Sequence, residues 1–541
     1  MFLNFSDIAG HQNLFLDYMY EFENVKQFYN NNFRDFDNYN QHFLNIKKGT
    51  RANRNKLVEI INQQYKQFKP SKLTEQNITA LKNDNTIAII TGQQLGILGG
   101  PLYTLYKTMT AIKLCAELKN KYENFNFVPV FWLEGDDHDF DEISQLNFID
   151  KNNSLRMLKY NDGLEEESNR GSIGNLIFNE NIEILIEELK ESLRHTDFTN
   201  EVFDLIEPNY YKGKSIKSAF SGLIFDLFDE YGLIIFDPQN KPVKELLKPI
   251  FKSEIENYKT NSAISIARSA ELENLYHAQV KIKPINLFVS DDTGRHSLEP
   301  GENYFRLKNK RKKFSKDELL ELLNQYPELF SPNVMLRPIC QDYLFPTGLY
   351  IGGPGEINYF AQVSTLYKCF NIEPPIIYPR ASLTIIEKNI FSTLNKLNLK
   401  YQDFFLGKDF FNDKVLNLIS EINLDQIFND TENQVKLLFS SLSDEIIHID
   451  QHLNSAVNKI IEKTNQNLKN IKNKAIKAQQ TKHSVTLRQI QKIETLIFPN
   501  EKLQERVLSF IYFVNKYGVG ILKWMINEIS INKFEHQILE L

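Results

Sequence analysis

The stretch IAIITGQQLGILGGPLYTLYK, Ile87–Lys107, decides the fold of this 541-residue chain. Its apolar beginning, Ile87–Ile90, is typical of a buried strand, and a glycine-rich turn leads from it to apolar residues at helical spacing. Pro101 suits the first position of that helix, where a backbone N–H would have no partner in any case. The next apolar run, Phe127–Leu133, indicates a second strand, so residues 87–133 are predicted to form a β-α-β unit with two parallel strands.

The sequence on both sides of this unit predicts a larger α/β protein with additional helical parts. Residues 1–80 contain almost no glycine or proline and show helical spacing of apolar residues, so we expect an N-terminal helical segment there. We expect an α/β core over residues 81–385, with inserted connecting segments at about 150–285. Its strands are expected to resume at Ile285–Ser290 and at Tyr343–Phe345.

A long helical region follows the core. Residues 408–498 contain neither glycine nor proline over 91 positions, a length that favours long helices over a compact α/β core. Apolar residues spaced alternately by four and three positions predict a coiled coil in an all-α domain of residues 386–500. The first ladder comprises Leu442, Ile446, Ile449, Leu453, Ala456 and Ile460.

The coiled coil needs a partner for its apolar ladder. A helix of 60 residues would extend about 90 Å, far beyond a core of ordinary size, so we expect a homodimer held by this domain. The polar break at 462–467 permits either a hairpin within one chain or a polar seam between two chains. Residues 501–541 are apolar enough to form helices that pack back on the core.

The composition excludes several classes of protein. Sixty-three basic against 69 acidic residues give a formal charge of −6, so no global positive field indicates a dedicated nucleic-acid-binding protein. A hydrophobic content of 42% is enough for large cores and excludes intrinsic disorder as the main state. The first ten residues lack a cationic signal-peptide region, and no apolar run is clean enough to span a membrane. We therefore expect a cytoplasmic protein without a membrane partner.

The three cysteines, Cys115, Cys340 and Cys369, are too few and too scattered for a disulfide framework or a cysteine-rich zinc site. They fit a reducing compartment. Cys115 and Cys369 fall among packing residues of predicted helices, and we expect none of the three to be a catalytic nucleophile.

The glycine-rich turn after the first strand is the first candidate site. Backbone N–H groups of such a turn can approach an anion, and the positive end of the following helix dipole favours a phosphate or carboxylate there. The pattern matches neither the phosphate loop of the Walker type nor the dinucleotide fingerprint. A tight crossover without a ligand is the alternative interpretation. The substrate- or nucleotide-binding candidates from this turn are Thr91, Gly92, Gln93, Gln94, Gly99, Gly100, Tyr103 and Lys107.

An acidic loop, EGDDHDFDE at Glu134–Glu142, directly follows the second strand and is the second candidate site. Ligands of open α/β sheets bind beyond the carboxyl ends of strands, so this loop and the glycine-rich turn are expected at the same edge. Its carboxylates could hold a cation, bind a substrate amine or supply a general base; a solvated loop is the alternative. We assign catalytic roles to Asp137, His138 and Asp139, substrate binding to Trp132 and Glu134, and no residue as a metal ligand.

Two weaker candidates lie later in the core. The segment GGPGEINYF, Gly352–Phe360, is another glycine loop that opens a predicted helix, and its Gly355 and Glu356 could contact substrate. In Pro379–Ser382 an arginine and a hydroxyl, Arg380 and Ser382, could meet phosphates, although Ser382 could equally cap a helix.

Three of these segments, TGQQLGILGGPLYTLYK, VPVFWLEGDDHDFDE and GGPGEINYF, followed by a long coil and FPNEKLQERV at Phe498–Val507, together resemble the BshC family over the whole chain. The family comprises cysteine ligases of bacillithiol synthesis. The resemblance implies a Rossmann-like core with inserted connecting segments, similar in plan to class I nucleotidyl-transferring ligases, and a dimerising coiled coil. It also implies that cysteine is joined to the amine of glucosaminyl-malate. An amide does not form from a free carboxylate and an amine in water, so ATP or another nucleotide is expected to activate the carboxyl group. Whether a metal is needed stays open.

Two other functions compete with this reading. The stretch Lys463–Ile493 has seven lysines, one arginine and no acidic residue, so an RNA-binding protein related to class I synthetases could use it to track a phosphate backbone. More often such a stretch is the solvated face of a coil. A pure coiled-coil scaffold is disfavoured by the two charged and glycine-rich loops. We therefore expect small-molecule substrates and no nucleic-acid partner.

Overall fold

The computed structural model divides the chain into two compact units, each described here by itself. The core unit comprises Met1–Ile385 and Lys502–Leu539, and the helical unit comprises Ile386–Glu501 and Glu540–Leu541. The described residues are 1–136, 139–165, 167–419, 424–446, 448–450 and 453–541.

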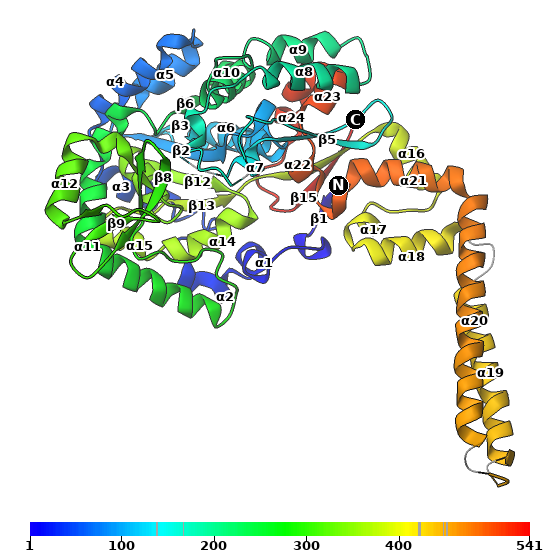
Figure 1. The fold of residues 1–541 in the computed structure, drawn as a ribbon. Helices are drawn as coiled ribbons and strands as arrows, with labels where there is room; N and C mark the ends of the chain where they lie inside the picture. Colours follow the sequence, from blue (N-terminus) through cyan, green and yellow to red (C-terminus); the bar gives the residue numbers. More distant parts are fainter. Residues whose placement is uncertain (137–138, 166, 420–423, 447, 451–452) are drawn as a thin grey trace. The chain divides into compact units, whose positions relative to one another are not determined.

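A five-stranded parallel sheet lies at the centre of the core unit (Figure 1). Its strands, in spatial order, are β13 (Ile376–Pro379), β12 (Thr347–Gly352), β2 (Thr86–Gln94), β3 (Asn126–Glu134) and β6 (Ile234–Phe236). The chain enters at the central β2, moves outward through β3 and β6, and then returns to the other side of β2 with β12 and β13. This doubly wound order confirms the predicted Rossmann-like α/β core and places its switch point between β2 and β12.

The predicted β-α-β unit is confirmed. Strands β2 and β3 pair in parallel from Thr86 opposite Asn126 to Gln94 opposite Glu134, which brings their carboxyl ends to one edge. Helix α6 (Tyr103–Lys121) connects them and packs on both. The helix begins two residues later than predicted, because the Pro101 backbone instead forms a bridge with Ser509.

Two insertions interrupt the sheet. In its described residues, the first, between β3 and β6, contains a β-hairpin and four α-helices: α7 (Phe140–Ile143), β4 (Gln145–Ile149), β5 (Leu155–Lys159), α8 (Asn181–Ser192), α9 (Thr199–Ile206) and α10 (Ile216–Phe228). The second, between β6 and β12, begins with the 33-residue helix α11 (Lys241–Glu273). An antiparallel sheet and two helices follow: β7 (Leu287–Asp291), β8 (Gly294–Pro300), β9 (Phe305–Leu307), β10 (Lys313–Phe314), α12 (Lys316–Gln325), β11 (Phe330–Pro332) and α13 (Arg337–Leu344).

Two strand predictions were wrong in this second insertion. The apolar run Ile285–Ser290 overlaps β7, which belongs to the antiparallel sheet rather than to the parallel core. Tyr343 and Leu344 lie at or beside the end of α13, and the next core strand starts at Thr347. Gly348 and Gly352 are therefore strand residues. A side chain at Gly348 would clash with Ile87 of the adjacent strand, at 2.4 Å.

The two ends of the chain complete the core unit. The N-terminal segment is mostly helical, as predicted, with α1 (Asn13–Tyr20), α2 (Phe22–Val25), α3 (Tyr39–Lys48), α4 (Arg54–Gln64) and α5 (Lys72–Ala80). After β12, the chain forms α14 (Pro354–Val363) and α15 (Leu366–Phe370). The C-terminal segment forms α22 (Gln504–Val507), α23 (Ile511–Tyr517) and α24 (Gly520–Glu528), and the chain ends join a small sheet of order β1-β15-β14, with β1 (Phe2–Leu3), β15 (His536–Glu540) and β14 (Ser382–Ile386).

The helical unit contains an antiparallel pair of long helices, α19 and α20, that pack side by side (Figure 1). Its helices are α16 (Lys388–Lys396), α17 (Gln402–Phe405), α18 (Lys408–Ile419), α19 (Leu424–Ile446), α20 (Leu453–Lys482) and α21 (Ser484–Ile497). The predicted coiled coil thus includes a hairpin within one chain. Its turn lies between Ile446 and Leu453, not at the polar break 462–467, which is continuous helix within α20. None of the helices in the described part of the chain is long and apolar enough to cross a bilayer.

Two buried histidines give the core unit a pH-dependent stability. His42 Nε2 lies 2.8 Å from the Gly348 carbonyl oxygen, and the His536 ring lies between Ser382 Oγ and Thr384 Oγ1, at 2.8 and 2.9 Å. Burial lowers the pKa of both residues from 6.5 to about 4. As the pH falls through this window, the unfolded histidine binds a proton and the folded one does not, so acidification favours unfolding.

We predict that the free energy of unfolding falls between pH 6.5 and 4, with a contribution from each buried histidine that approaches about 1.4 kcal/mol per pH unit. His536→Gln removes one contribution and makes the dependence shallower by about that slope. Urea unfolding at a series of pH values measures it. His195→Gln, at an exposed position, is the matched control. An unchanged slope in His536→Gln contradicts the assignment.

Candidate active site

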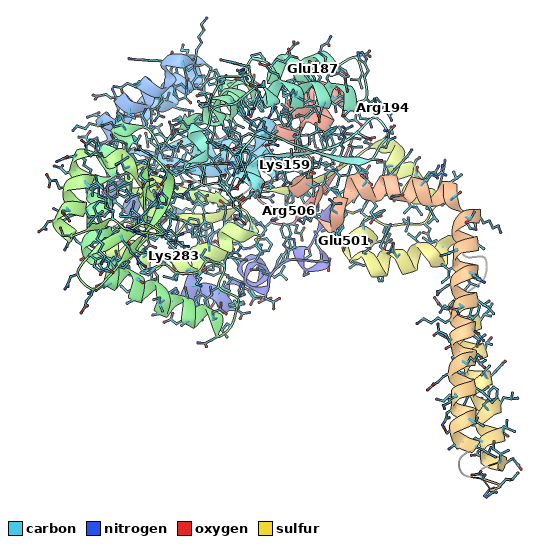
Figure 2. All side chains as sticks on the ribbon, in the orientation of Figure 1. Lys159, Glu187, Arg194, Lys283, Glu501 and Arg506 are labelled. Atoms are coloured by element: carbon cyan, nitrogen blue, oxygen red, sulfur yellow. The ribbon has the colours of Figure 1, made fainter. Side chains whose placement is uncertain are left out.

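A cleft of about 880 Å³ opens at the switch point of the sheet, where the doubly wound fold places its ligands. The ends of β2 and β3 and the beginnings of α6, α13 and α14 line one side. The segment Gln279–Lys283 between α11 and β7, the antiparallel sheet and Arg506 of α22 line the rest. Figure 2 labels Lys283 and Arg506, two lining residues from segments that are far apart in the sequence.

An ion pair between buried Lys107 and half-buried Glu356 joins the two sides of the switch point. Lys107 Nζ lies 2.6 Å from Glu356 Oε2 and donates to the Gly92 carbonyl oxygen at 2.6 Å and to Gln93 Oε1 at 3.1 Å. Glu356 also accepts hydrogen bonds from the Gly353 N–H and the Tyr350 hydroxyl. Burial alone would raise the pKa of Glu356, but the Lys107 charge and these hydrogen bonds hold that pKa below its usual value. The carboxylate is therefore ionised at neutral pH.

A second polar group lies beside it. Arg337 Nη2 donates to the Tyr359 hydroxyl at 2.7 Å, and Arg337 Nε lies 3.6 Å from Glu134 Oε2. The Trp132 indole N–H donates to the same Glu134 oxygen at 3.2 Å. Glu134 is thus a fixed carboxylate at the end of β3, oriented by one cation and one neutral donor.

Arg380 belongs to a third buried group. Its Nη2 donates to Glu505 Oε1 at 2.7 Å, and Glu505 also accepts from Ser382 Oγ at 2.8 Å and from the Leu383 N–H at 2.9 Å. Glu505 is fully buried, and although burial alone would raise the pKa of its carboxyl, Arg380 holds that pKa below the usual value. The Ser382 hydroxyl in addition meets His536.

The acidic loop is only partly a cleft feature. Glu134, Asp139 and Glu142 line the cleft. Asp136 does not, because it forms a buried ion pair with Lys244 of α11 at 2.6 Å, which anchors the loop to the second insertion. The proposed catalytic residues Asp137 and His138 lie outside the described residues.

The structure brings together most, but not all, of the site residues predicted from the sequence. Those that line the cleft are Gly92, Gln93, Gln94, Tyr103, Lys107, Trp132, Glu134, Asp139, Gly355, Glu356 and Arg380. Thr91 does not, because its buried hydroxyl donates to the Ile351 carbonyl oxygen and joins β2 to β12. Ser382 is likewise buried in the Glu505 group.

The glycine pair Gly99 and Gly100 also lies away from the cleft. Their φ angles are 88° and 67°, in the left-handed region that glycine favours, and a side chain at Gly99 would meet Phe510 at 2.9 Å. These glycines therefore serve the tight crossover into α6, which was the alternative interpretation. Neither glycine lines the cleft, and glycine is favoured by close packing at Gly99 and by the positive φ at both positions, so their position does not support the expected phosphate-cradle role.

Several cleft residues were missed by sequence reasoning. Arg337 and Tyr350 come from segments that were not singled out as candidate sites, and Arg295, Lys281 and Lys283 come from the second insertion. Tyr359 lies within the glycine loop Gly352–Phe360 but was given no role. Arg506 lies within FPNEKLQERV, which carried the resemblance but was given no role. Of these residues, Tyr359 and Arg506 lie in segments whose sequence signal could have identified them.

The cysteines lie elsewhere. Cys115 and Cys340 are buried, Cys369 is half-buried, and none of the three lines the cleft as the described residues define it. Burial raises the pKa of all three thiols, which disfavours the reactive thiolate.

The lining of the cleft has two electrostatic sides. Three acidic side chains, Glu134, Asp139 and Glu142, come from the segment that begins at the end of β3, and the fourth, Glu356 of α14, is paired with Lys107. Cationic side chains come mainly from the other elements: Lys107, Lys281, Lys283, Arg295, Arg337, Arg380 and Arg506. Among the described residues, no three His, Cys, Asp or Glu side chains converge as a metal-binding group.

Comparison with known proteins identifies relatives over the whole chain. Residues 1–381 match "Bacillithiol biosynthesis BshC, N-terminal Rossmann-like domain", and residues 383–541 match the "C-terminal coiled-coil domain" of the same family. Relatives named "Putative cysteine ligase BshC" include those of Chloroherpeton thalassium, 36% identical over 94% of this chain and 92% of the relative, and Salinibacter ruber, 32% identical over 98% and 97%. The Bacillus cytotoxicus relative is 30% identical over 90% and 91%.

A doubly wound core with a charged cleft at its switch point and a coiled-coil region, together with the names of its relatives, places the chain among the Rossmann-like ligases. It belongs to the BshC family. The resemblance noted in the sequence and the predicted enzyme class are thereby confirmed.

We predict that Lys107 and Glu356 are energetically coupled. Lys107→Met or Glu356→Gln alone leaves the other charged group without its ion-pair partner and lowers the free energy of unfolding by about 3 to 5 kcal/mol. The double variant Lys107→Met/Glu356→Gln loses less than the sum of the two single variants, by at least about 1 kcal/mol. Urea unfolding of the four proteins measures the coupling. Additivity within about 0.5 kcal/mol would show that the pair does not act as a unit.

Proposed function

We propose that this protein joins the carboxyl group of cysteine to the amine of glucosaminyl-malate and so forms bacillithiol. Full-length relatives named as cysteine ligases support the cysteine substrate, and the description of the matching family supports the pathway. The RNA-binding alternative is not favoured, because the family match extends through the basic stretch Lys463–Ile493 as part of the coiled-coil domain.

The two-sided lining of the cleft is the observation that carries the proposal. A condensation of these substrates brings an amine of the acceptor to a carboxyl group of cysteine, while the malyl group brings further carboxylates. Glu134 and Asp139 suit the amine, and the cationic side suits the carboxylates. A volume of about 880 Å³ is in the upper part of the range for small-molecule sites.

Activation of the cysteine carboxyl group is proposed to use a nucleotide such as ATP. The cleft fits a phosphate in one respect, since Lys281, Lys283 and Arg506 supply exposed cations at its lining. A bound nucleotide would supply the leaving group that makes the carboxyl carbon reactive toward an amine. The protein's own part is to hold the anionic groups through these cations; Gly99 and Gly100 are buried and do not line the cleft.

The amine must lose a proton before or during its attack. We assign this step to His138 or Asp137, with Asp139 beside them at the cleft, from their position directly after the carboxyl end of β3. We assign the orientation of the amine to Glu134, because Trp132 and Arg337 hold its carboxylate in place.

We predict that the purified protein converts cysteine and glucosaminyl-malate to bacillithiol only when a nucleoside triphosphate is supplied, as measured by mass spectrometry of thiol-labelled products. His138→Ala lowers kcat about 10²- to 10⁴-fold, as expected for loss of a general base. His195→Ala, an exposed histidine outside the cleft, is the control. The base assignment is contradicted if folded His138→Ala and folded Asp137→Asn each restore normal bacillithiol levels in a deletion strain.

We also propose a cytoplasmic homodimer. The three free thiols favour a reducing compartment. The α19–α20 hairpin leaves large apolar side chains exposed, among them Leu437 at 71%, Leu438 at 72% and Ile449 at 80%. A second copy of the same hairpin would cover these side chains with twofold symmetry.

We predict that deletion of residues 432–497 with a short linker leaves a soluble monomer, and that Leu437→Glu/Leu438→Glu in the full chain dissociates the dimer at micromolar concentration. A buried charge in an apolar interface is costly, whereas the same charge at exposed Gln434 is tolerated. Sedimentation velocity measures both, with Gln434→Glu as the control. A full-length double variant that stays dimeric places the interface elsewhere.

A further inference from the structure

Arg506 differs from the other arginines of the cleft. Arg295, Arg337 and Arg380 each donate hydrogen bonds to protein acceptors. Arg506 also lines the cleft, but its side chain is exposed and has no hydrogen-bond or ion-pair partner among the described residues. It is therefore the one arginine of the described lining whose donors are available to a ligand.

The two residues that precede Arg506 in the sequence hold its backbone in place at the cleft. Gln504 is fully buried and makes a reciprocal pair with the backbone of Ile385, accepting from its N–H at 2.9 Å and donating to its carbonyl oxygen at 3.0 Å. Glu505, also fully buried, binds Arg380, Ser382 and the Leu383 N–H. Two successive buried side chains thus hold α22 against β14 (Ser382–Ile386) from Ser382 to Ile385 and leave the next residue at the cleft.

The charge of Arg506 is not neutralised as that of Arg380 is. Glu505 compensates Arg380 at 2.7 Å, and both arginines also line a small adjoining cavity with His11. Burial lowers the pKa of His11 to about 4, so this imidazole is neutral at pH 7 and adds no charge. Arg506 consequently contributes the uncompensated positive charge at this end of the cleft.

We propose that Arg506 is a substrate-binding residue that takes a carboxylate or phosphate group of a ligand, with Gln504 and Glu505 as positioning residues. The planar guanidinium offers two parallel donors that match either oxyanion. The proposal rests on the proposed ligase function for the choice of ligands: the malyl carboxylates, the cysteine carboxylate and the phosphates of the activating nucleotide. All of these groups are oxyanions that can accept two parallel hydrogen bonds from one guanidinium.

The test compares Arg506→Met, Arg506→Lys and the matched control Lys502→Met, which removes a charge from the same exposed segment outside the cleft. Isothermal titration of each full-length protein with L-malate, L-cysteine and ATP separates the three sources of the oxyanion. Steady-state kinetics with the complete substrates then gives KM and kcat for each.

We predict that Arg506→Met weakens binding of one of these probes and raises the KM of the corresponding substrate about 10- to 100-fold, with kcat changed less than threefold. Arg506→Lys recovers part of the loss, and Lys502→Met stays within about twofold of the wild type. The probe that loses affinity identifies the group bound.

Failure of this proposal is distinguishable from failure of the proposed function. If no ligase activity is found but Arg506→Met still loses binding of a probe, the anion site stands and the ligase proposal falls. If the wild-type protein is an active ligase and Arg506→Met has unchanged KM values and unchanged probe binding, the anion site falls. Absence of measurable binding of all three probes to the wild type, with unchanged KM values in Arg506→Met, also overturns it.

Discussion

One buried ammonium group joins the two halves of the sheet on which the site depends. Lys107 leaves α6 on the side of β2 and β3, yet its ion-pair partner Glu356 belongs to α14, which follows β12 on the other side of the switch point. The same ammonium binds the Gly92 carbonyl oxygen at the end of β2. A charge this deeply buried requires compensation, so the position of α14 relative to β2 is constrained by the cost of leaving either partner alone. Lys107 and Glu356 both line the cleft, so this ion pair determines the geometry of its floor.

Two arginines of the cleft are also compensated by fixed partners, as Lys107 is. Arg337 is oriented by Tyr359 and lies near Glu134, and Arg380 is oriented by Glu505. Because each of these charges is already compensated by fixed groups, the floor of the cleft is preorganised and changes little when a ligand arrives. The exposed cations Lys281, Lys283 and Arg506 have no such partner among the described residues. A ligand that brings negative charge would therefore meet a rigid floor and an uncompensated rim.

The sequence predicted the parts of this arrangement that depend on local patterns. Apolar runs and the glycine-rich turn were enough for β2, α6 and β3, and the rule that ligands lie beyond strand carboxyl ends was enough to bring Lys107 and Glu134 to one edge. The roles of Thr91 and Gly99 could not be predicted. A threonine that bonds a neighbouring strand and a glycine required by packing occur in the same sequence pattern as a ligand-binding turn. Arg337 could not be found either, since only the tertiary fold brings an ordinary helix start to the cleft.

The helical unit illustrates another limit of local patterns. The ladder Leu442, Ile446, Ile449 and Leu453 has continuous coiled-coil spacing, yet the chain reverses between Ile446 and Leu453. Spacing reports which residues could share a helix face and is silent about where one helix ends if neither glycine nor proline marks the turn. The polar segment 462–467 continues as helix because none of its residues breaks the backbone hydrogen bonds.

The order of the chain has a consequence for how the core is completed. The family's N-terminal domain matches residues 1–381, but the carboxylate that compensates Arg380 is Glu505, and the Gln504 side chain that binds Ile385 follows the whole helical unit. A chain ending at residue 381 would keep Arg380 and lose its counter-charge, which is the costly way to break a buried pair. The core unit is therefore assembled from both sides of the coiled-coil insertion, and its cleft is complete only when residues 502–539 have returned to it. The continuous segment 1–381 is therefore not a complete core, because the counter-charge of its Arg380 comes from Glu505.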